Sequence, residues 1–391
     1  MRAVLIAHDG DLSGGANMFL LEAACALRER GCWVGIVVPT QGSLSDAANH
    51  AGYEVLFHPI AYWVGNTGPW QWRIRCFLAN VPSMWRLGAL IREHEADVVF
   101  TNTITTPSGA FAALRAGVPH IWIIHELFGS AGQGLHFNLG AKVSLCLMNR
   151  ASERLIVVSE AAERLYGKFF AKKKIDLVRQ SVGSDSTASV PSGSPPKDDS
   201  VFKLAYVSNV YPAKRQEDAI RATKVLRDSG IDARLVVVGR ADPAYRLFLE
   251  KLIAELDVSE AVHLVGFSET PAQYLGDADV CLMCSEGEGL GRVTIEAMKA
   301  GKPVAAARSG GTVELVQDGI NGLLYEPQNA AALAAALRML WSDEPLRSKL
   351  GRQGQAWAVA TYNAKRFSEQ LWSSILAATD SRTTVAAVGK S

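Results

Sequence analysis

The chain has 391 residues, of which 48% are hydrophobic, so it is long enough for two domains of ordinary size with large cores. Its 40 basic and 39 acidic residues leave a formal net charge of +1, which argues against a protein that binds nucleic acid. Six scattered cysteines do not form a disulfide framework, which favours a reducing, cytoplasmic location. No apolar run approaches the ~20 residues that cross a bilayer, and residues 1–9 predict a first strand rather than a signal peptide.

The first half of the chain alternates short apolar runs with longer helical patterns. A Gly14-Gly15 loop follows the first run, and an amphipathic helix is predicted over residues 17–30. Because strands that alternate with helices pair in parallel, we expect a doubly wound parallel sheet. Its predicted strands are residues 3–7, 34–38, 98–101, 120–124 and 155–158.

The same rhythm restarts after a polar segment at residues 184–200, which is rich in Ser and Pro and typical of a linker. Two such sheets predict a cleft at the carboxyl ends of their strands, where α/β proteins bind ligands. A last helical pattern covers residues 364–376. The strands predicted for the second half are residues 203–208, 234–239, 262–266, 278–284 and 304–307.

Residues 285–324 are the most informative part of the chain. A buried strand ends there in a loop with two carboxylates and two glycines, and the loop leads into a helix that carries Glu296 near its start. A helix N-terminus offers backbone N–H groups and a positive dipole end to an anionic or polyhydroxylated ligand. Glu288 and Glu296 can accept hydrogen bonds from different hydroxyls of one extended ligand. The alternative for each is a solvated carboxylate or a Glu favoured by the helix dipole, but the glycine turns that follow make the combination specific.

This stretch resembles the Glu-x7-Glu signature of retaining glycosyltransferases of family four, which have the GT-B fold. The match reads Glu288-Gly-Leu-Gly-Arg-Val-Thr-Ile-Glu296. It is followed by Gly-x-Pro-Val, by Gly-Gly-x-x-Glu ending at Glu314, and by Gly-Ile-Asn-Gly-Leu. The resemblance covers residues 201–360 well and residues 1–185 more loosely.

The resemblance implies an α/β protein of two Rossmann-like, doubly wound parallel-sheet domains with an interdomain cleft. We therefore place an N-terminal acceptor-side domain at 1–185, a linker at 186–200 and a C-terminal nucleotide-sugar-binding domain at 201–361. In the family, a C-terminal helix, here 362–378, crosses back onto the first domain. The small, polar residues 379–391 predict a disordered tail.

The resemblance also implies which residues bind the donor. In the family motif Gly-Arg-Leu-x-x-x-Lys-Gly the Arg and Lys hold the donor diphosphate. Lys214 matches the Lys, whereas Asn209 replaces the Arg and Arg215 replaces the last Gly, where it could restore the charge. A surface lysine beside a turn is the alternative for Lys214. The implied donor-binding residues are Gly14, Gly15, Asn209, Lys214, Arg215, Gly266, Phe267, Glu288, Gly289, Leu290, Gly291, Arg292, Val293 and Glu296.

Three residues carry the predicted chemistry: Lys214, Glu288 and His125. By resemblance, Lys214 stabilises the departing diphosphate, Glu288 binds the hydroxyls of the transferred sugar, and His125 lines the cleft near sugar and acceptor. Structural roles are the alternatives, namely helix–sheet packing for Gly14 and Gly15 and a buried imidazole for His125. The sequence assigns no role to the neighbouring Glu126.

We expect no metal and no cofactor beyond the donor. Asp9-Gly-Asp11 and Asp277-Ala-Asp279 have the spacing of a metal-binding Asp-x-Asp motif, but neither has a third ligand. The Cys281 and Cys284 pair has zinc-like spacing without a second pair, which favours buried thiols.

The predicted function is transfer of a hexose-type sugar, with retention, from a UDP- or GDP-sugar to a glycan or lipid-linked acceptor in surface polysaccharide or lipopolysaccharide-type biosynthesis. The alternatives are a nucleotide-sugar epimerase, a phosphorylase, or an inactive nucleotide-sugar-binding module. A dinucleotide-dependent oxidoreductase would need Gly-x-Gly-x-x-Gly after the first strand, where the chain has Ser-Gly-Gly-Ala.

Two segments mix aromatic and basic residues, which is typical of proteins that lie on an anionic membrane surface. They are residues 70–86, with Trp70, Trp72 and Trp85, and residues 164–174, with three consecutive lysines. The predicted location is therefore cytoplasmic, with peripheral association at the inner face of the plasma membrane. The alternative is that the tryptophans belong to the core and the lysines to a solvated face.

Overall fold

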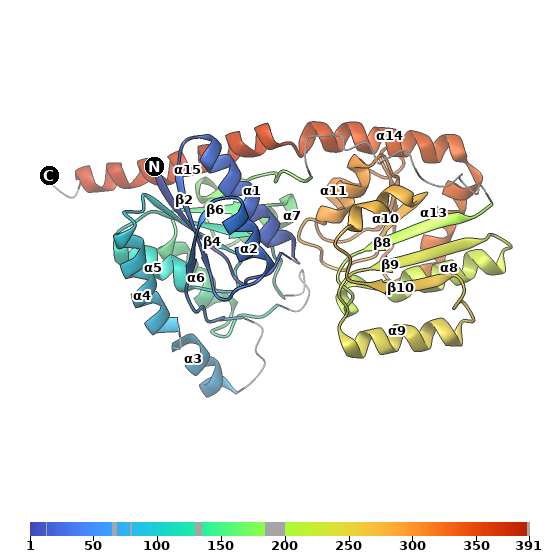
Figure 1. Cartoon of the computed structure of the whole chain (residues 1–391), viewed down its shortest axis with the longest axis horizontal. Coiled ribbons are helices and arrows are strands. Elements are labelled where there is room, and N and C mark those ends of the chain that lie inside the picture. Colours follow the sequence, from blue (N-terminus) through green and yellow to red (C-terminus); the bar gives the residue numbers. More distant parts are fainter. Residues whose placement is uncertain (13, 65–68, 79, 130–134, 184–199, 389–391) are drawn as a thin grey trace. The chain divides into compact units, whose positions relative to one another are not determined.

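The structure of the chain is a computed structural model that describes residues 1–12, 14–64, 69–78, 80–129, 135–183 and 200–388, with backbone alone for residues 76 and 381–388. Residues 186–199 of the predicted linker lie outside the described residues. The chain divides into two compact units, Met1–Ser181 with Ala364–Ser391 (unit 1), and Val182–Asn363 (unit 2). The colours of Figure 1 follow the sequence, so unit 1 runs from blue to green and includes the red C-terminal residues, and unit 2 runs from green through yellow and orange.

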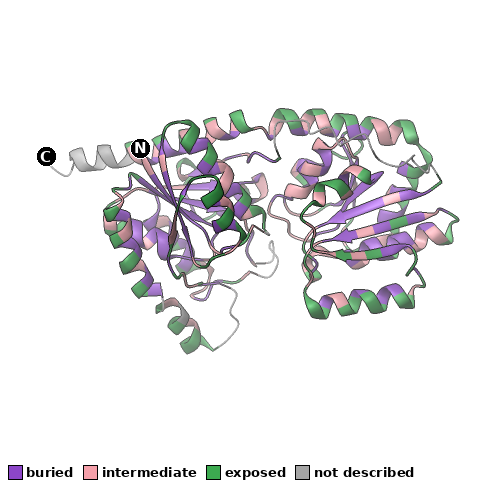
Figure 2. Cartoon of the chain, in the orientation of Figure 1, coloured by how far each residue is buried: buried purple, intermediate pink, exposed green. Residues whose placement is uncertain are grey.

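Unit 1 is built on a seven-stranded sheet in the order β3-β2-β1-β4-β5-β6-β7, and every neighbouring pair is parallel. The strands β1, β4, β5 and β6 read as nearly unbroken apolar runs because helices cover both faces of the sheet. Figure 2 shows these strands as buried. The strands are β1 (Arg2–Ile6), β2 (Trp33–Val38), β3 (Glu54–Phe57), β4 (Val98–Asn102), β5 (His120–Ile124), β6 (Arg154–Val157) and β7 (Ile175–Leu177).

The helices of unit 1 pack on this sheet except at one end, where α3 extends away from it (Figure 1). The helices are α1 (Gly15–Glu29), α2 (Ser43–His50), α3 (Trp70–Leu78), α4 (Asn80–Glu93), α5 (Ser108–Ala116), α6 (Ala141–Ala151), α7 (Glu160–Tyr166) and α15 (Ala364–Val388). The last of these returns to unit 1 and packs on α1, β5 and β6. Its Phe367 ring meets the Phe19 ring edge to face at 5.0 Å. The helix continues well beyond residue 378, into the segment for which the sequence predicted a disordered tail.

Unit 2 has a six-stranded parallel sheet in the order β10-β9-β8-β11-β12-β13. Its strands are β8 (Phe202–Val207), β9 (Ala233–Val238), β10 (Val262–Gly266), β11 (Val280–Met283), β12 (Val304–Ala307) and β13 (Leu323–Tyr325). Its helices are α8 (Gln216–Asp228), α9 (Pro243–Glu255), α10 (Pro271–Asp277), α11 (Arg292–Lys299), α12 (Thr312–Leu315), α13 (Ala330–Ser342) and α14 (Glu344–Thr361).

The strand order fixes where each unit can hold a ligand. In unit 2 the chain winds outward from β8 to β10 and then restarts on the other side of β8 with β11. In unit 1 the reversal lies between β1 and β4. At such a reversal the loops after the two neighbouring strands diverge and leave a crevice at the carboxyl ends. The predicted doubly wound fold is confirmed. The loops after β8 and β11 lie at the reversal of unit 2 and are therefore the expected position of a ligand site.

Candidate functional site

The loops after β8 and β11 meet through an ion pair. Lys214 Nζ lies 2.6 Å from Glu288 Oε2, and the two side chains are only 12% and 16% exposed. Burial disfavours the charged ammonium, but Glu288 and Tyr211 more than offset this, so the pKa of Lys214 lies above its ordinary value. The site thus presents a lysine that is charged at neutral pH beside a carboxylate.

A buried tyrosine hydroxyl holds these two loops together. Tyr206, on β8, donates a hydrogen bond to the carbonyl oxygen of Lys214, and its oxygen lies 3.2 Å from the backbone nitrogen of Cys284, which donates to it. Ser285 Oγ lies 3.4 Å from the same oxygen. Burial raises the pKa of Tyr206, which keeps the hydroxyl protonated as a donor. The Tyr206 hydroxyl therefore helps to position the loops that carry Lys214 and Glu288. No sequence motif indicated Tyr206.

The loop that carries Glu288 is also fixed from its other side by the loop after β12. The backbone nitrogen of Gly311 donates to the carbonyl oxygen of Glu288 at 2.7 Å, and that of Gly287 donates to Ser309 Oγ at 3.0 Å. A Cβ on Gly310, whose φ is +54°, would lie 2.4 Å from the Glu288 carbonyl oxygen. The Gly310-Gly311 pair is therefore required for this close backbone approach.

Helix α11 starts directly after this loop, at the left-handed Gly291 (φ +90°). In its first turns Arg292 Nε lies 3.1 Å from Glu296 Oε1. Burial raises the pKa of Glu296, and Arg292 partly opposes the shift. With its side chain still 31% exposed, Glu296 is an acceptor that a ligand hydroxyl can reach.

Arg215, the residue that could restore the charge that Asn209 lacks, is engaged in ion pairs within unit 2. It lies 3.0 Å from Glu217, 3.0 Å from Asp218 and 3.7 Å from Glu286, so three carboxylates share its charge. Asn209 is exposed at the end of β8, and its carbonyl oxygen accepts a hydrogen bond from Gln216. Two further members of the predicted set lie at the end of β10: Gly266 is its last residue, and Phe267, which is 59% exposed, follows it.

Unit 1 collects its predicted residues at the carboxyl ends of β1 and β5. Gly14 and Gly15 open α1, and His125 follows β5. His125 Nε2 lies 2.8 Å from Asn102 Oδ1, while the Asn102 amide donates to the Ala16 carbonyl oxygen at 3.0 Å. The Asn102 oxygen therefore accepts from Nε2–H of His125, which fixes the ring. No sequence motif indicated Asn102.

Glu126 has a structural role. Its Oε2 accepts hydrogen bonds from the backbone nitrogens of Ile104 and His125, both at 3.2 Å. Burial raises the pKa of this carboxyl group, and His8 opposes the shift. The carboxylate thus stabilises the turn that places His125.

In each Asp-x-Asp pattern one carboxylate contacts another group of the protein. Asp279 accepts a hydrogen bond from the backbone nitrogen of Lys203 at 2.9 Å, and Asp9 lies 3.0 Å from His8 Nε2. Among the described residues, no group of three or more His, Cys, Asp or Glu side chains is arranged to hold a metal ion. Burial raises the pKa of Cys281 and of Cys284 to about 12, as for buried, protonated thiols.

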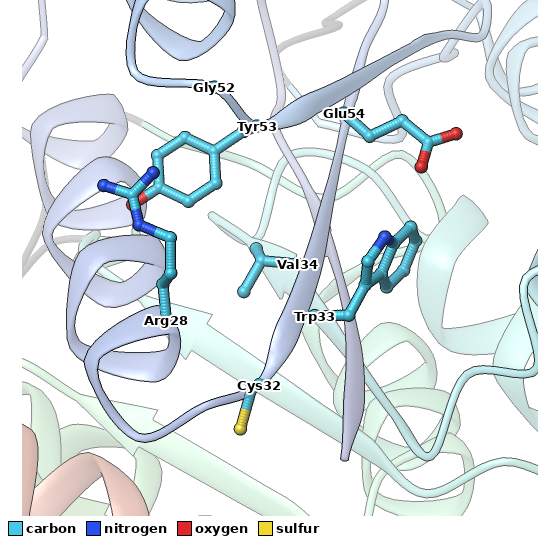
Figure 3. A pocket seen from close by; sticks show the side chains of 7 residues that line it. All are labelled: Arg28, Cys32, Trp33, Val34, Gly52, Tyr53 and Glu54. Atoms are coloured by element: carbon cyan, nitrogen blue, oxygen red, sulfur yellow. The ribbon is translucent and has the colours of Figure 1, made fainter.

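A pocket of about 490 Å³ lies at the other edge of the unit 1 sheet, where β2 and β3 begin (Figure 3). Two side chains stack on its Trp33 ring, the Arg2 guanidinium at 4.1 Å and the His94 ring at 5.4 Å from the ring centre. The pocket contains none of the predicted site residues. It is lined by Arg28, Cys32, Trp33, Val34, Gly52, Tyr53 and Glu54. Over the part of the chain that the structure describes, no helix has the length and apolarity needed to traverse a membrane.

Comparison with known proteins agrees with this geometry. The model of the family described as glycosyl transferases group 1 matches residues 192–357, and that of glycosyltransferase family 4 matches residues 13–182. The D-inositol 3-phosphate glycosyltransferase of Actinosynnema mirum is 27% identical over 89% of this chain and 90% of its own length. The N-acetyl-alpha-D-glucosaminyl L-malate synthase of Bacillus anthracis is 29% identical, but the match spans 43% of each chain.

Among solved structures, Anabaena Alr3699/HepE in complex with UDP superposes with a TM-score of 0.78, at 22% identity, over 96% of this chain and 99% of that one. Its fold is the two-domain GT-B fold that the sequence predicted. The chain belongs to glycosyltransferase family four, and it is a GT-B transferase.

Proposed function

We propose that the protein is a retaining hexosyltransferase that uses a UDP- or GDP-sugar as donor and a glycan or lipid-linked acceptor in surface polysaccharide or lipopolysaccharide-type biosynthesis. The observation that carries the proposal is the buried pair of Lys214 and Glu288 at the strand reversal of unit 2. An ammonium and a carboxylate side by side match a donor in which a diphosphate adjoins a sugar with free hydroxyls. The UDP complex of Anabaena HepE supports a uridine nucleotide for the donor.

In this proposal the residues act on the leaving group and not as a covalent nucleophile. Lys214 stabilises the negative charge that develops on the departing diphosphate. Glu288 accepts hydrogen bonds from the transferred sugar and Glu296 from the ribose. Since double displacement would need a carboxylate beneath the anomeric carbon, we assign retention to front-face substitution, in which the departing phosphate takes up the acceptor's proton.

The other predicted site residues are assigned to the remaining parts of the donor and to the acceptor. We assign the backbone of Gly14 and Gly15 to the diphosphate, that of Gly266 and Phe267 to the base, and His125 to the transferred sugar and acceptor. The loop from Gly289 to Val293 supports Glu288 and Glu296.

The first tests of the proposal are which nucleotide sugar the protein binds and whether turnover requires a metal ion. Thermal-shift measurements with UDP-, GDP- and ADP-sugars should select one nucleotide. Turnover of that donor should survive EDTA, because one carboxylate of each Asp-x-Asp pattern, Asp279 and Asp9, already contacts a group of the protein. Complete loss of turnover that Mn²⁺ or Mg²⁺ restores would contradict the mechanism. Donor binding without turnover would indicate a binding module, and an altered donor sugar would indicate an epimerase.

Replacement of Lys214 tests the charge on the leaving group. Lys214→Ala should lower kcat by roughly 10²–10³, as for loss of one contact that stabilises transition-state charge. Lys224→Ala on α8 is the matched control, since Lys224 pairs with Asp228 on the exposed face of the same unit. If Lys214→Ala changed kcat less than about threefold, another cation would carry the charge.

The two glutamates should separate in calorimetry because they are assigned to different parts of the donor. Glu296→Ala should weaken binding of free nucleoside diphosphate by ~1–3 kcal/mol, since ribose hydroxyls lose an acceptor. Glu288→Ala should hardly change that affinity but should strongly reduce transfer from the intact donor. The exposed Glu250 on α9 provides the control variant, Glu250→Ala. Equal loss of nucleotide affinity in both site variants would disprove the division of roles.

For the acceptor we propose peripheral association with an anionic membrane at the cytoplasmic face, through the surface of α3 and α4. The names of the relatives point to different acceptors, inositol 3-phosphate and malate, so this part of the proposal depends on the chain's own surface. Trp70, Trp72, Leu78 and Trp85 are 44–66% exposed there. Residues 70–93, of which the structure describes all but residue 79, contain four arginines and one glutamate. Apolar rings among basic side chains suit an anionic lipid surface.

Vesicle binding tests this surface. Replacing Trp72 by Ser together with Arg75 by Gln should lower partitioning onto phosphatidylserine-containing vesicles by at least about fivefold, from the charge alone. The control is Trp341→Ser with Arg338→Gln on α13, because Trp341 has the same 44% exposure and the two residues have the same spacing. Equal partitioning of both variants would refute the membrane assignment.

A further inference from the structure

Lys214 alone does not balance the charge of a diphosphate. Its ammonium is already paired with Glu288, so the pair is close to neutral, whereas a nucleoside diphosphate brings several negative charges. Anionic groups of this kind are normally bound by more than one donor. Arg215, the nearest arginine in sequence, is held by Glu217, Asp218 and Glu286. We therefore consider cations on the other loops at this edge of unit 2.

The loop after β9 places Arg240 beside Asn209. Strands β8 and β9 pair in parallel up to Val207 and Val238, and the pairing resumes beyond them as a bridge between Val210 and Ala241. The backbone nitrogen of Val210 donates to the Arg240 carbonyl oxygen at 2.8 Å, and that of Asp242 donates to the Val210 carbonyl oxygen at 2.8 Å. Residues in register on parallel neighbours lie side by side, so Asn209 and Arg240 do so.

Gly239 makes this approach possible. Its φ is +151°, and a Cβ built on it would lie 1.8 Å from the carbonyl oxygen of Ser208. No side chain fits at that distance, so the two loops touch backbone to backbone. The backbone of Arg240 consequently lies next to the end of β8. Its side chain is long enough for the guanidinium to reach a ligand that contacts Asn209.

Arg240 also contacts the ring of Phe267. The guanidinium carbon lies 5.7 Å from the centre of that ring, within the range of a cation–π contact. Both side chains are exposed at the carboxyl edge of the sheet. Arg240 thus lies between the loop of Lys214 and the residue that we assign to the base.

We propose that Arg240 supplies the second cation for the donor diphosphate, in place of the charge that residue 209 lacks. This assignment rests on the proposed use of a nucleotide-sugar donor. A guanidinium can form two parallel hydrogen bonds to phosphate oxygens, so it can replace an arginine on the neighbouring strand without a change in chemistry.

The test is a charge relocation measured by calorimetry on the full chain with UDP, or with GDP if the donor screen selects it. Arg240→Ala should weaken binding of the diphosphate by about 10- to 100-fold, and binding of the free nucleoside much less. Adding Asn209→Arg to Arg240→Ala should restore affinity to within about threefold of wild type. Arg240→Lys, which keeps the charge, should lose less than Arg240→Ala.

Two controls make the result specific. Arg234→Ala removes an exposed arginine that pairs with Asp232 at the opposite end of β9, and it should leave affinity unchanged. Arg215→Ala compares the other candidate cation. Unchanged affinity in Arg240→Ala, equal losses for diphosphate and nucleoside, or no rescue by Asn209→Arg would overturn the assignment. If the wild type bound no nucleoside diphosphate at all, the proposed function would fail first and the assignment with it.

Discussion

The ion pair of Lys214 and Glu288 joins residues 74 positions apart, and the chemistry that we propose for unit 2 depends on it. Removing two charges from water is costly unless hydrogen bonds and a fixed geometry compensate. The structure supplies that geometry through the Tyr206 hydroxyl and through the backbone of Gly311. A ligand with both phosphate and hydroxyl groups can separate the pair, because its phosphate binds the Lys214 ammonium and its hydroxyls donate to the Glu288 carboxylate.

The parallel sheet explains why the two charges meet. In a doubly wound sheet all strands end at the same edge, and loops separated by many residues converge where the winding reverses. Glycine then sets how closely these loops approach, as Gly239 and Gly310 do at contacts too short for any side chain. The local backbone requirement and the global topology therefore favour the same site, and substitutions at these glycines would affect it without touching a ligand.

Much of the fold and part of the site could be predicted from the sequence. Buried strands such as β4 and β5 are mostly apolar and were predicted close to their observed bounds. The edge strands β3, β7 and β13 were missed because none of them contains four consecutive apolar residues, unlike the equally short β11 and β12. Motif spacing predicted Lys214 and Glu288 as site residues, and the structure brings them together in an ion pair. Tyr206 and Asn102 could not be found, since their roles arise from contacts with loops distant in sequence and not from a local pattern.

We propose that the loops after β8 and β11 bind the donor nucleotide. Hydrogen exchange of the full chain, followed by mass spectrometry with and without saturating UDP or GDP, tests this assignment. We expect slower exchange in peptides that cover residues 208–215 and 284–296, where the backbone that holds Lys214 and Glu288 becomes ordered by the ligand. If nucleotide binding left the exchange rates of both segments unchanged and slowed exchange in other parts of the chain, these loops would not be the nucleotide site.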